Sequence, residues 1–197
     1  MGMKVAALCS GGKDSSFALW LAMQRGHEVV QVVAMIPRRE DSWMFHYPNI
    51  QLIDLFAECV GLSLIKGKTS GEREVELEDL KQVLQTLDVE GVVSGAIASN
   101  YQKSRIDRIC KELGLKSIAP LWGREPLELL REFIAAGFET IITSVSAEGF
   151  DESWLGRKLD ETAVRDLLEL NRRYKVNLSG EGGEYESLVL DAPFFEK

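Results

Sequence analysis

Ser10-Gly11-Gly12-Lys13-Asp14-Ser15 joins a short apolar run to an amphipathic one, and this junction decides the fold class. Residues 3–8 are typical of a buried strand, and residues 15–25 are typical of a helix that ends at Gly26. The two glycines allow a sharp turn without a Cβ to block a ligand, and the free N–H groups of the helix start form an anion nest. In an open α/β sheet such a loop lies at the carboxyl ends of the strands, where ligands bind. The junction therefore predicts a phosphate-binding loop.

The plain alternative is a strand–turn–helix junction with Asp14 or Ser15 as the helix N-cap. It is the weaker interpretation, because a simple turn needs neither the two serines nor the lysine. Other nucleotide loops are excluded by spacing. Gly67-Lys68-Thr69 matches only the end of a Walker A loop, since Leu62 stands where the first glycine belongs, and no GxGxxG motif occurs. We therefore expect residues 67–71 to form a loop between a strand and a helix.

Outward from this loop, buried strands alternate with helices. We expect strands at residues 3–8, 28–36, 62–66, 91–95 and 117–121, and helices at residues 15–25, 50–60, 72–87 and 101–113. Continuous apolar strands between helices predict a mostly parallel sheet covered on both faces, and right-handed crossovers make it a doubly wound α/β layer. Beyond it we expect helices at 125–136 and 159–174 and strands at 139–146 and 186–190. The pattern predicts a nucleotide-binding domain at 1–120 and a smaller substrate lobe at 121–197 that share one core.

Composition and net charge narrow the range of functions that the protein could have. The 197 residues include 23 Lys and Arg against 31 Asp and Glu, a formal net charge of −8. This balance disfavours broad nucleic-acid binding, which depends on basic surface. The two histidines exclude a multi-histidine metal site, and the three scattered cysteines disfavour a disulfide framework and indicate a reducing cytoplasm. No apolar run approaches the roughly 18 residues of a membrane span, and we expect no signal peptide at residues 1–4.

Three motifs together carry a family resemblance. The stretch SGGKDS at residues 10–15 resembles the SGGxDS signature of the PP-loop, or N-type ATP pyrophosphatase, superfamily. Residues 94–105 read SGAIASNYQKSR, and residues 180–187 read GEGGEYES. With the start of the chain, these stretches resemble the diphthine–ammonia ligase family over nearly the whole sequence. The length is that of an archaeal-type, single-domain member without the further C-terminal domains of eukaryotic relatives.

The resemblance implies a fold and a reaction. The fold is that of the adenine nucleotide alpha hydrolase-like PP-loop ATPases. The reaction is the last step of diphthamide formation on translation elongation factor 2. ATP activates the diphthine carboxylate as an acyl-adenylate with release of pyrophosphate, and ammonia then displaces AMP. ATP and Mg²⁺ are the implied cofactors, and the elongation factor and ammonia are the implied partners. No cysteine–histidine pair suggests a glutaminase, so the ammonia has to come from free ammonium or from a separate donor protein.

The ATP site is expected at the ends of three strands. The phosphate loop should cradle pyrophosphate, with Lys13 and Asp14 as catalytic residues and Asp14 as the magnesium ligand, although an N-cap role for Asp14 is equally open. In PP-loop folds the backbone at the end of the second strand reads adenine, which points to Ala34 and Met35 unless these are simply core. The full ATP-binding set is Ser10, Gly11, Gly12, Lys13, Asp14, Ser15, Ser16, Ala34, Met35, Ser94, Gly95 and Ala96.

The segment after the fourth expected strand contains a third candidate catalytic residue, Arg105, and one part of the expected substrate site. Tyr101 and Arg105 are spaced i, i+4 and should share one helix face, from which Arg105 can clamp a phosphate or a carboxylate. The alternative is a solvated helix face. Ser99, Tyr101 and Gln102 are the expected substrate-binding residues in this segment.

The second part of the substrate site is an acidic turn. Three carboxylates in a glycine-rich turn repel one another unless a cation binds between them. The candidate cations are Mg²⁺, ammonium and the trimethylammonium group of diphthine. Tyr185, Trp122 or Trp154 would supply an aromatic face, and an exposed acidic turn is the alternative. The expected residues are Glu181, Gly182, Gly183, Glu184 and Glu186.

A loop at residues 38–48 carries His46, which we interpret as a surface histidine rather than a base. Trp43, Met44 and Phe45 beside it suggest a mobile flap over ATP or a partner surface.

Two other functions compete with amide ligation. A tRNA-modifying PP-loop enzyme would need a basic surface and, for sulfur transfer, a working cysteine pair. A non-catalytic adenine-nucleotide sensor would explain the phosphate loop but not the acidic GEGGE segment.

Overall fold

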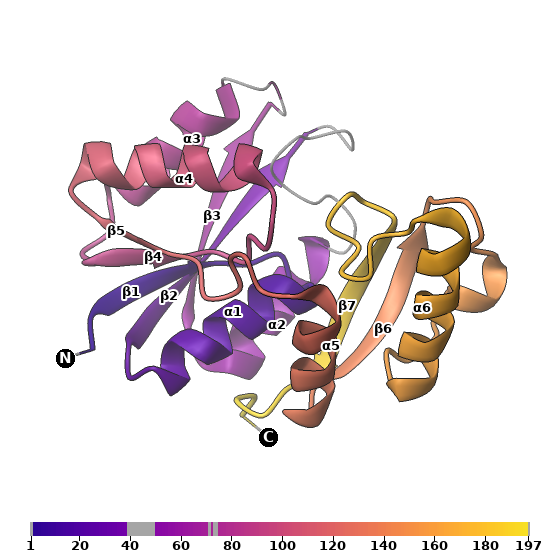
Figure 1. Ribbon diagram of the computed structural model, residues 1–197. Helices are drawn as coiled ribbons and strands as arrows, with labels where there is room; N and C mark the ends of the chain where they lie inside the picture. The colour runs from indigo at the N-terminus through magenta and orange to yellow at the C-terminus, as the bar shows by residue number, and fades with distance from the viewer. Residues whose placement is uncertain (1, 39–49, 71, 73–74, 197) are drawn as a thin grey trace. The chain divides into compact units, whose positions relative to one another are not determined.

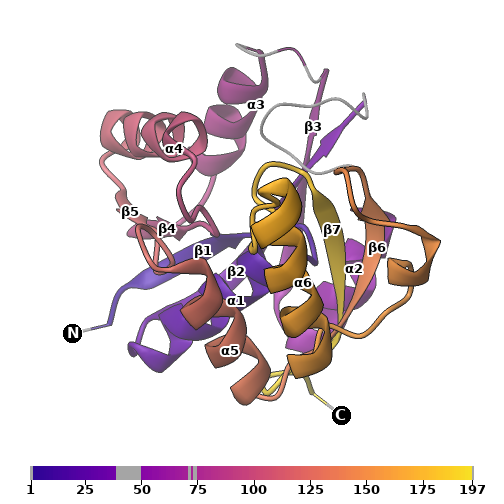
Figure 2. The same ribbon diagram turned by 45° about the vertical axis from the view of Figure 1, so that its right-hand side comes forward.

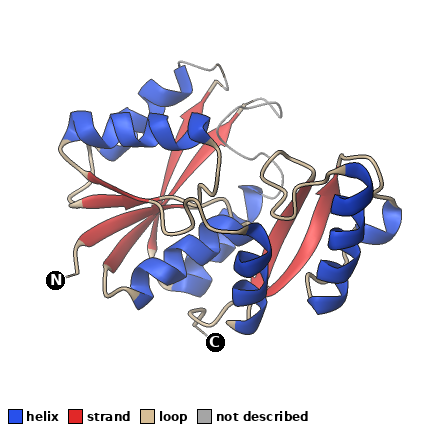
Figure 3. Cartoon of the chain, viewed as in Figure 1, coloured by secondary structure: helices blue, strands red, loops and turns tan. Residues whose placement is uncertain are grey.

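The chain forms two compact units, which a computed structural model describes over residues 2–38, 50–70, 72 and 75–196 (Figure 1). Unit 1 comprises Met1–Trp122 with Glu196–Lys197, and unit 2 comprises Gly123–Phe195. Each unit has its own sheet, drawn in red in Figure 3. Among the described residues no helix is long and apolar enough to cross a membrane.

Unit 1 is built on a five-stranded sheet in the order β3-β2-β1-β4-β5, and every neighbouring pair is parallel. Strands this apolar need cover on both faces, and the middle of β1 is at most 1% exposed. The parallel sheet predicted from the alternating apolar runs is therefore confirmed. Its strands are β1 (Lys4–Leu8), β2 (Glu28–Pro37), β3 (Ser63–Thr69), β4 (Gly91–Val93) and β5 (Lys116–Ile118).

Helices cover both faces of this sheet, as Figures 1 and 2 show, with α1 and α2 on one face and α3 and α4 on the other. A cluster that includes Met35, Leu80, Val92 and Ile109 forms the core beneath α3 and α4. This arrangement confirms the doubly wound α/β layer. The helices are α1 (Lys13–Gln24), α2 (Ile53–Val60) after the short η1 (Ile50–Leu52), α3 (Val75–Leu84) and α4 (Asn100–Leu113).

The expectation of a loop at residues 67–71 is wrong for its first part, because β3 continues to Thr69. Met35 pairs with Gly67 and Pro37 with Thr69, so the parallel ladder with β2 extends the strand beyond its apolar run. A Cβ at Gly67 would lie 2.4 Å from the Met35 sulfur. The glycine that resembles part of a Walker motif therefore serves close packing against the core.

The sheet reverses its direction of winding at β1. From β1 the chain goes to β2 and then β3 on one side, and later returns to β4 and β5 on the other side. The carboxyl ends of β1 and β4 are therefore neighbours at a topological switch point, which is where open α/β sheets bind ligands. The segments that leave these two ends begin at Cys9 and at Ser94, so the predicted motifs at residues 10–15 and 94–105 both start here.

Unit 2 contains a two-stranded antiparallel sheet and two helices that contact each other and lie beside it in Figure 2. Residues 156–159 bind the edge of β6 opposite β7, since Ile142 N donates to Arg157 O at 3.0 Å and Leu159 N donates to Thr140 O at 2.8 Å. Phe133 and Phe138 stack at 4.4 Å between ring centroids. The elements are α5 (Pro126–Ala135), β6 (Glu139–Val145), η2 (Glu152–Trp154), α6 (Glu161–Tyr174) and β7 (Tyr185–Asp191).

Asp160 caps α6, and this cap makes a stability prediction. Its Oδ1 accepts from Thr162 N and Ala163 N, both at 2.9 Å, and from the Thr162 hydroxyl at 2.5 Å. The bond from the Thr162 side chain, followed by that from the Ala163 N–H, lowers the pKa of the Asp160 carboxyl. We expect Asp160→Ala to lower the free energy of unfolding by about 1 kcal/mol at neutral pH.

Because the folded pKa is lowered, the stabilisation is present above the unfolded value of about 3.9 and is lost as the pH falls through the folded value. Urea unfolding followed by circular dichroism at neutral and acid pH measures both effects. Glu161→Ala is the control, since Glu161 also lies in the first turn but is not the cap. A difference between Asp160→Ala and the unsubstituted chain that persists undiminished in acid would contradict the prediction.

Candidate active site

The loop between β1 and α1 is shaped by its two glycines. Gly11 has a φ of +82°, a left-handed conformation that favours glycine. Gly12, not Asp14 or Ser15, is the N-cap of α1, with φ −80° and ψ 167°, and no side-chain hydrogen bond caps this helix in the described structure. The N-cap alternative for Asp14 and Ser15 is thus wrong. The first-turn N–H groups keep the anion-binding capacity of an uncapped helix start.

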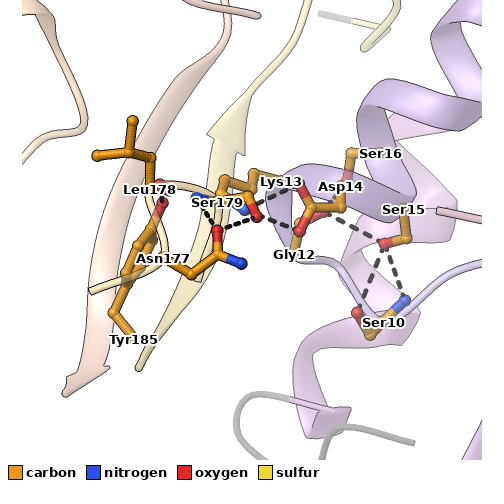
Figure 4. Close-up of polar contacts among 10 residues, drawn as sticks. All are labelled: Ser10, Gly12, Lys13, Asp14, Ser15, Ser16, Asn177, Leu178, Ser179 and Tyr185. Atoms are coloured by element: carbon orange, nitrogen blue, oxygen red, sulfur yellow. Dashed lines mark hydrogen bonds and ion pairs between the residues drawn. The ribbon is translucent and has the colours of Figure 1, made fainter. Parts of the chain in front are cut away.

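The loop serines hold the loop itself (Figure 4). The Ser15 hydroxyl accepts from Ser10 N and donates to Gly12 O, both at 3.2 Å. The Ser16 hydroxyl, which is fully buried, donates to the same carbonyl at 2.8 Å. The serine hydroxyls therefore preorganise the turn, and the donors left for an anion are chiefly backbone N–H groups.

Lys13 and Asp14 form a tight ion pair at the start of α1. Lys13 Nζ lies 2.8 Å and 2.7 Å from the two oxygens of the Asp14 carboxylate. The lysine side chain is 5% exposed and the aspartate side chain is 36% exposed. A buried ammonium needs such a partner, because transfer of an unpaired charge out of water is costly.

The segment after β4 packs directly on this helix start. A Cβ at Gly95 would lie 2.8 Å from both the Asp14 carbonyl carbon and Ser15 N, which are backbone atoms that cannot move aside. Ser94 and Ala96 on either side are buried. The structure therefore brings together the predicted residues 10–16 and 94–96. Gly95, which the sequence analysis placed in the ATP-binding set, admits the backbone of the phosphate loop.

Ala34 and Met35 lie on the interior strand β2, at 0% and 3% exposure. The ladder of β2 with β1 ends at Val33, whereas its ladder with β3 continues to Pro37. The side chains of Ala34 and Met35 thus belong to the core.

Tyr101 and Arg105 share a face of α4, as their spacing predicts. The Arg105 guanidinium stacks on the Tyr101 ring at 3.5 Å from its centroid, and Nη1 donates to Tyr101 O at 3.3 Å. Stacking fixes the plane of the guanidinium, which suits it to bidentate recognition of a carboxylate or phosphate. Ser99 is the N-cap of α4, and its hydroxyl accepts from Gln102 N at 3.3 Å.

Lys103 forms a second cation–aromatic contact that sequence reasoning did not select. Its Nζ lies 5.3 Å from the centroid of the Trp122 ring and 2.5 Å from Asp107. Burial alone would raise the pKa of the Asp107 carboxyl, but hydrogen bonds from Lys103 and Ser117 outweigh burial and lower this pKa. Only the i, i+4 spacing of Lys103 and Asp107 could have indicated the ion pair from sequence.

Two of the three cysteines, Cys9 and Cys110, have thiols of low reactivity. All three are free thiols. Burial raises the pKa of Cys9 to about 12, and burial together with the Asp107 charge raises the pKa of Cys110 to about 11. Thiols that stay protonated are poor nucleophiles. Neither Cys9 nor Cys110 is suited to carry sulfur.

The acidic turn of unit 2 is tied into its own unit. Glu184 Oε1 accepts from Asn177 N at 3.2 Å, and the same carboxylate lies against Gly182. Ser146 N donates to Glu184 O at 2.9 Å. Glu186 lies on β7 opposite Ser144. Over the described parts of the chain, no group of three His, Cys, Asp or Glu side chains is arranged to hold a metal ion.

Asn177 organises the start of the turn and was not among the predicted residues. Its side-chain oxygen accepts from Ser179 N at 3.0 Å and from the Ser179 hydroxyl at 2.8 Å, an Asx turn that the Asn-x-Ser spacing could have indicated (Figure 4). The Tyr185 hydroxyl donates to Leu178 O at 2.8 Å. Tyr185 and Trp154 are 3% and 5% exposed, so they belong to the core of unit 2 and do not offer an open aromatic face.

His46 lies outside the described residues, as do Trp43, Met44 and Phe45. Just before that segment, Arg38 N donates to Thr69 O at 3.0 Å, which continues the ladder between β2 and β3.

The contact at Gly95 makes a prediction about the loop. Gly95→Ala should displace the Asp14–Ser15 peptide and weaken nucleotide binding by at least about tenfold, measured by titration calorimetry. Gly114→Ala is the matched control, because it strains the left-handed C-cap of α4 but meets no atom within 4 Å. The control should lose thermal stability and keep its nucleotide affinity. Equal nucleotide affinity in both variants would show that Gly95 does not seat the loop.

The comparisons with known proteins cover both units. Residues 3–117 match the family model of the diphthamide synthase N-terminal domain, and residues 125–197 match that of the diphthamide synthase C-terminal domain. The diphthine--ammonia ligase of Homo sapiens is 38% identical over 218 residues, which cover 99% of this chain and 81% of the human protein. The diphthine--ammonia ligase of Schizosaccharomyces pombe is also 38% identical, and this chain spans 35% of its length.

A solved structure supports the fold alone. It is the predicted subunit of a tRNA methyltransferase from Methanocaldococcus jannaschii, with a TM-score of 0.52, 17% identity, and coverage of 97% of this chain and 98% of that chain. At that identity the likeness carries no argument for action on tRNA. The two family matches and the identity to the human protein show that this chain belongs to the diphthamide synthase family, whose members include the diphthine--ammonia ligases.

Proposed function

We propose that this chain is an ATP-dependent diphthine–ammonia ligase that completes diphthamide on translation elongation factor 2. The observation that carries the proposal is a preorganised phosphate loop at the switch point of a chain 38% identical to a diphthine--ammonia ligase over 99% of its length. In this proposal unit 1 binds ATP and unit 2 binds the protein substrate. Free thiols suit a reducing compartment, and we place the reaction in the cytoplasm.

The reaction balances as an adenylyl transfer followed by an acyl transfer. The diphthine carboxylate oxygen attacks the α-phosphorus of ATP, which forms the acyl-adenylate and breaks the α–β phosphoanhydride bond to release pyrophosphate. Ammonia then attacks the acyl carbon, AMP leaves with the bonding electron pair, and the nitrogen loses a proton to give the amide. Both steps place negative charge on phosphate oxygens, so preorganised positive groups are what catalysis requires.

In unit 1 the backbone N–H groups at Gly11, Gly12 and the start of α1 would hold the pyrophosphate, with Lys13 supplying a positive charge. The Arg105 guanidinium, fixed in plane on Tyr101, is suited to the α-phosphate or the substrate carboxylate. The backbone at Ala34 and Met35 would read the adenine edge. Ser99, Tyr101 and Gln102 would border the substrate.

Mg²⁺ fits the phosphate loop through Asp14. This ion is commonly bound by one or two carboxylates together with substrate phosphates, and Asp14 supplies one partly exposed carboxylate beside the loop. When bound, the ion would neutralise charge on the phosphates. Among the side chains of the loop, Asp14 alone would bind the Mg²⁺ ion. Phosphate oxygens and water would supply the other ligands of the ion.

Unit 2 would recognise the cationic end of diphthine. Glu181 and Glu186 offer carboxylates on either side of Gly182 and Gly183, and a trimethylammonium group is attracted by such charges without needing donors. Glu184 contributes charge to the same turn while its oxygen holds Asn177 N.

Ammonia has to reach the chain from outside. The sequence has two histidines, and burial keeps Cys9 and Cys110 protonated, so a built-in glutaminase has no support. We propose free ammonium or a separate donor protein as the source.

The direct test is reconstitution. The protein is mixed with ATP, Mg²⁺, ammonium and elongation factor 2 that carries diphthine, and mass spectrometry follows the conversion of the carboxylate to the amide. AMP and pyrophosphate should appear in step with the amide, and elongation factor without diphthine should give neither. ATP binding without AMP release on the complete mixture would overturn the proposal in favour of a nucleotide sensor.

Lys13→Ala tests the phosphate loop. Loss of one preorganised positive group should raise the barrier by about 2–4 kcal/mol, which lowers kcat on the order of 30- to 900-fold. Lys4→Ala is the control, because Lys4 forms an ion pair with Asp88 at the amino end of β1, away from the loop. Unchanged turnover in Lys13→Ala would exclude this role.

Glu181→Gln and Glu186→Gln test the cation site of unit 2. Each should raise KM for the protein substrate by about tenfold and leave kcat nearly unchanged, because only charge recognition is lost. Glu184→Gln keeps the acceptor for Asn177 N and should retain wild-type stability, whereas Glu184→Ala should lower the melting temperature. Exposed Glu152→Gln is the control. A normal KM in both Glu181→Gln and Glu186→Gln would refute the cation site.

A further inference from the structure

We propose that a side-chain cluster between α4 and the segment after it, here called the α4 clamp, orients the first two turns of α4 and thereby positions the Arg105 guanidinium. The members of the α4 clamp are Lys103, Asp107, Ser117 and Trp122. They are positioning residues, because they act on the substrates only through Arg105. The inference rests on the proposed function in one respect, namely that Arg105 contacts a phosphate or a carboxylate.

The Arg105 guanidinium takes its orientation from its own helix. It stacks on the Tyr101 ring at 3.5 Å from the centroid, and its Nη1 donates to Tyr101 O at 3.3 Å. Both contacts lie within α4, so they set the plane of the guanidinium relative to the helix. The direction of that plane within unit 1 therefore depends on how the first turns of α4 are held against the sheet.

Apolar packing holds the later turns of α4 more firmly than the first turn. The buried residues of this helix are Ile106, Ile109 and Cys110, which all follow the first turn. In the first turn, Tyr101 is only partly buried where it packs against the same core. A polar restraint near the start of the helix therefore adds to what the core provides.

The α4 clamp supplies such a restraint on the far flank of the helix. Successive helix residues are about 100° apart, so Lys103 and Asp107 lie on the opposite side from Arg105. Lys103 Nζ donates to Asp107 at 2.5 Å and lies 5.3 Å from the centroid of the Trp122 ring. Because Trp122 follows β5, this contact resists rotation of α4 about its own axis, which is the movement that would turn Arg105 away.

A second link joins the clamp to the sheet. The Asp107 carboxylate accepts hydrogen bonds from both Lys103 and the Ser117 side chain of β5, and these bonds keep the pKa of the carboxyl low despite burial. The side chains of Lys103 and Asp107 are 26% and 39% exposed. A cation shared by a carboxylate and an aromatic ring has a narrow range of favourable positions. The clamp is therefore a charged contact with a defined geometry.

The strand that receives the clamp also borders the phosphate loop. Next to Ser117 in β5, Ile118 O accepts from Ser94 N at 2.9 Å. Gly95 then packs against the Asp14–Ser15 peptide. The clamp thus fixes α4 to the same strand that fixes the segment seating the phosphate loop, which sets Arg105 in register with that loop.

The plain alternative is an i, i+4 ion pair that only stabilises the helix. The other end of α4 offers a matched control, where Lys81 of α3 donates to Glu112 at 2.7 Å. The side chains of this second pair are 31% and 45% exposed, close to the values of the clamp pair. If the ion pairs of α4 contribute stability alone, Lys103→Met and Lys81→Met should affect activity equally.

The first part of the experiment needs no ligand and measures amide hydrogen exchange by mass spectrometry. Lys103→Met should speed exchange in peptides covering residues 100–107 by about tenfold, because the start of α4 opens more often. Lys103→Arg should retain the protection, since a guanidinium keeps the charge and stacks on Trp122. Lys81→Met should leave these peptides unchanged. Thermal melting verifies folding, and Asp107→Asn takes the place of Lys103→Met if that variant does not fold.

The second part follows AMP release in the complete ligase mixture. Lys103→Met should lower kcat about 30-fold and change KM for ATP less than about threefold, because a displaced guanidinium loses transition-state contacts. Lys103→Arg should restore kcat to within about threefold. Lys81→Met should lower the melting temperature and keep kcat. In an Arg105→Lys background, Lys103→Met should cost less than about threefold, because a flexible ammonium depends little on helix orientation.

Three outcomes would overturn the inference. They are unchanged exchange at residues 100–107 in folded Lys103→Met, unchanged kcat in the same variant, and an equal loss of kcat with Arg105 and with Arg105→Lys. The last result would show that Lys103 does not act through Arg105. If the unsubstituted chain releases no AMP, the ligase is rejected, and the exchange measurement still decides whether the clamp holds α4. Amide formation with unchanged exchange would reject the clamp alone.

Discussion

The close approach of two backbones at the switch point is the constraint on which the rest of unit 1 depends. The segment after β4 meets the first turn of α1 at a distance that admits no Cβ at Gly95. That contact sets the position of the Asp14–Ser15 peptide, and through it the direction of the first N–H groups of the helix. The serine hydroxyls then hold the Gly12 carbonyl. An anion site made from backbone in this way is already organised before any ligand arrives, which is the property that electrostatic catalysis needs.

Much of the fold of unit 1 could be predicted from sequence, because buried parallel strands are apolar on both faces and are separated by amphipathic helices. The end of β3 could not be predicted in this way. Residues 67–69 lack an apolar pattern, and what makes them a strand is the ladder with β2. The α1 N-cap was misassigned for a related reason. Local propensity favours Asp14 or Ser15, but the tertiary contact of the loop places the helix start one residue after Gly12.

The candidate site shows a different limit. Residue types and motif spacing were enough to select residues 10–16 and 94–96, but not to say what each atom does. The hydroxyls of Ser15 and Ser16 could be proposed for phosphate from chemistry alone, and in the structure both donate to Gly12 O. Trp154 and Tyr185 have the right chemistry for a cation cage, yet they are buried as core. Burial and hydrogen-bond partners are properties of packing, and a single sequence does not state them.

Residues 156–159 act as a short third strand beside β6. A two-stranded sheet is marginal by itself and presents open edges to other chains. By donating from Leu159 N and accepting at Arg157 O, this segment uses the hydrogen-bonding groups that β6 would otherwise offer to a strand from another molecule. A protein that acts on another protein gains from such an edge. On that side, unit 2 is closed to indiscriminate strand addition and to the self-association that follows from it.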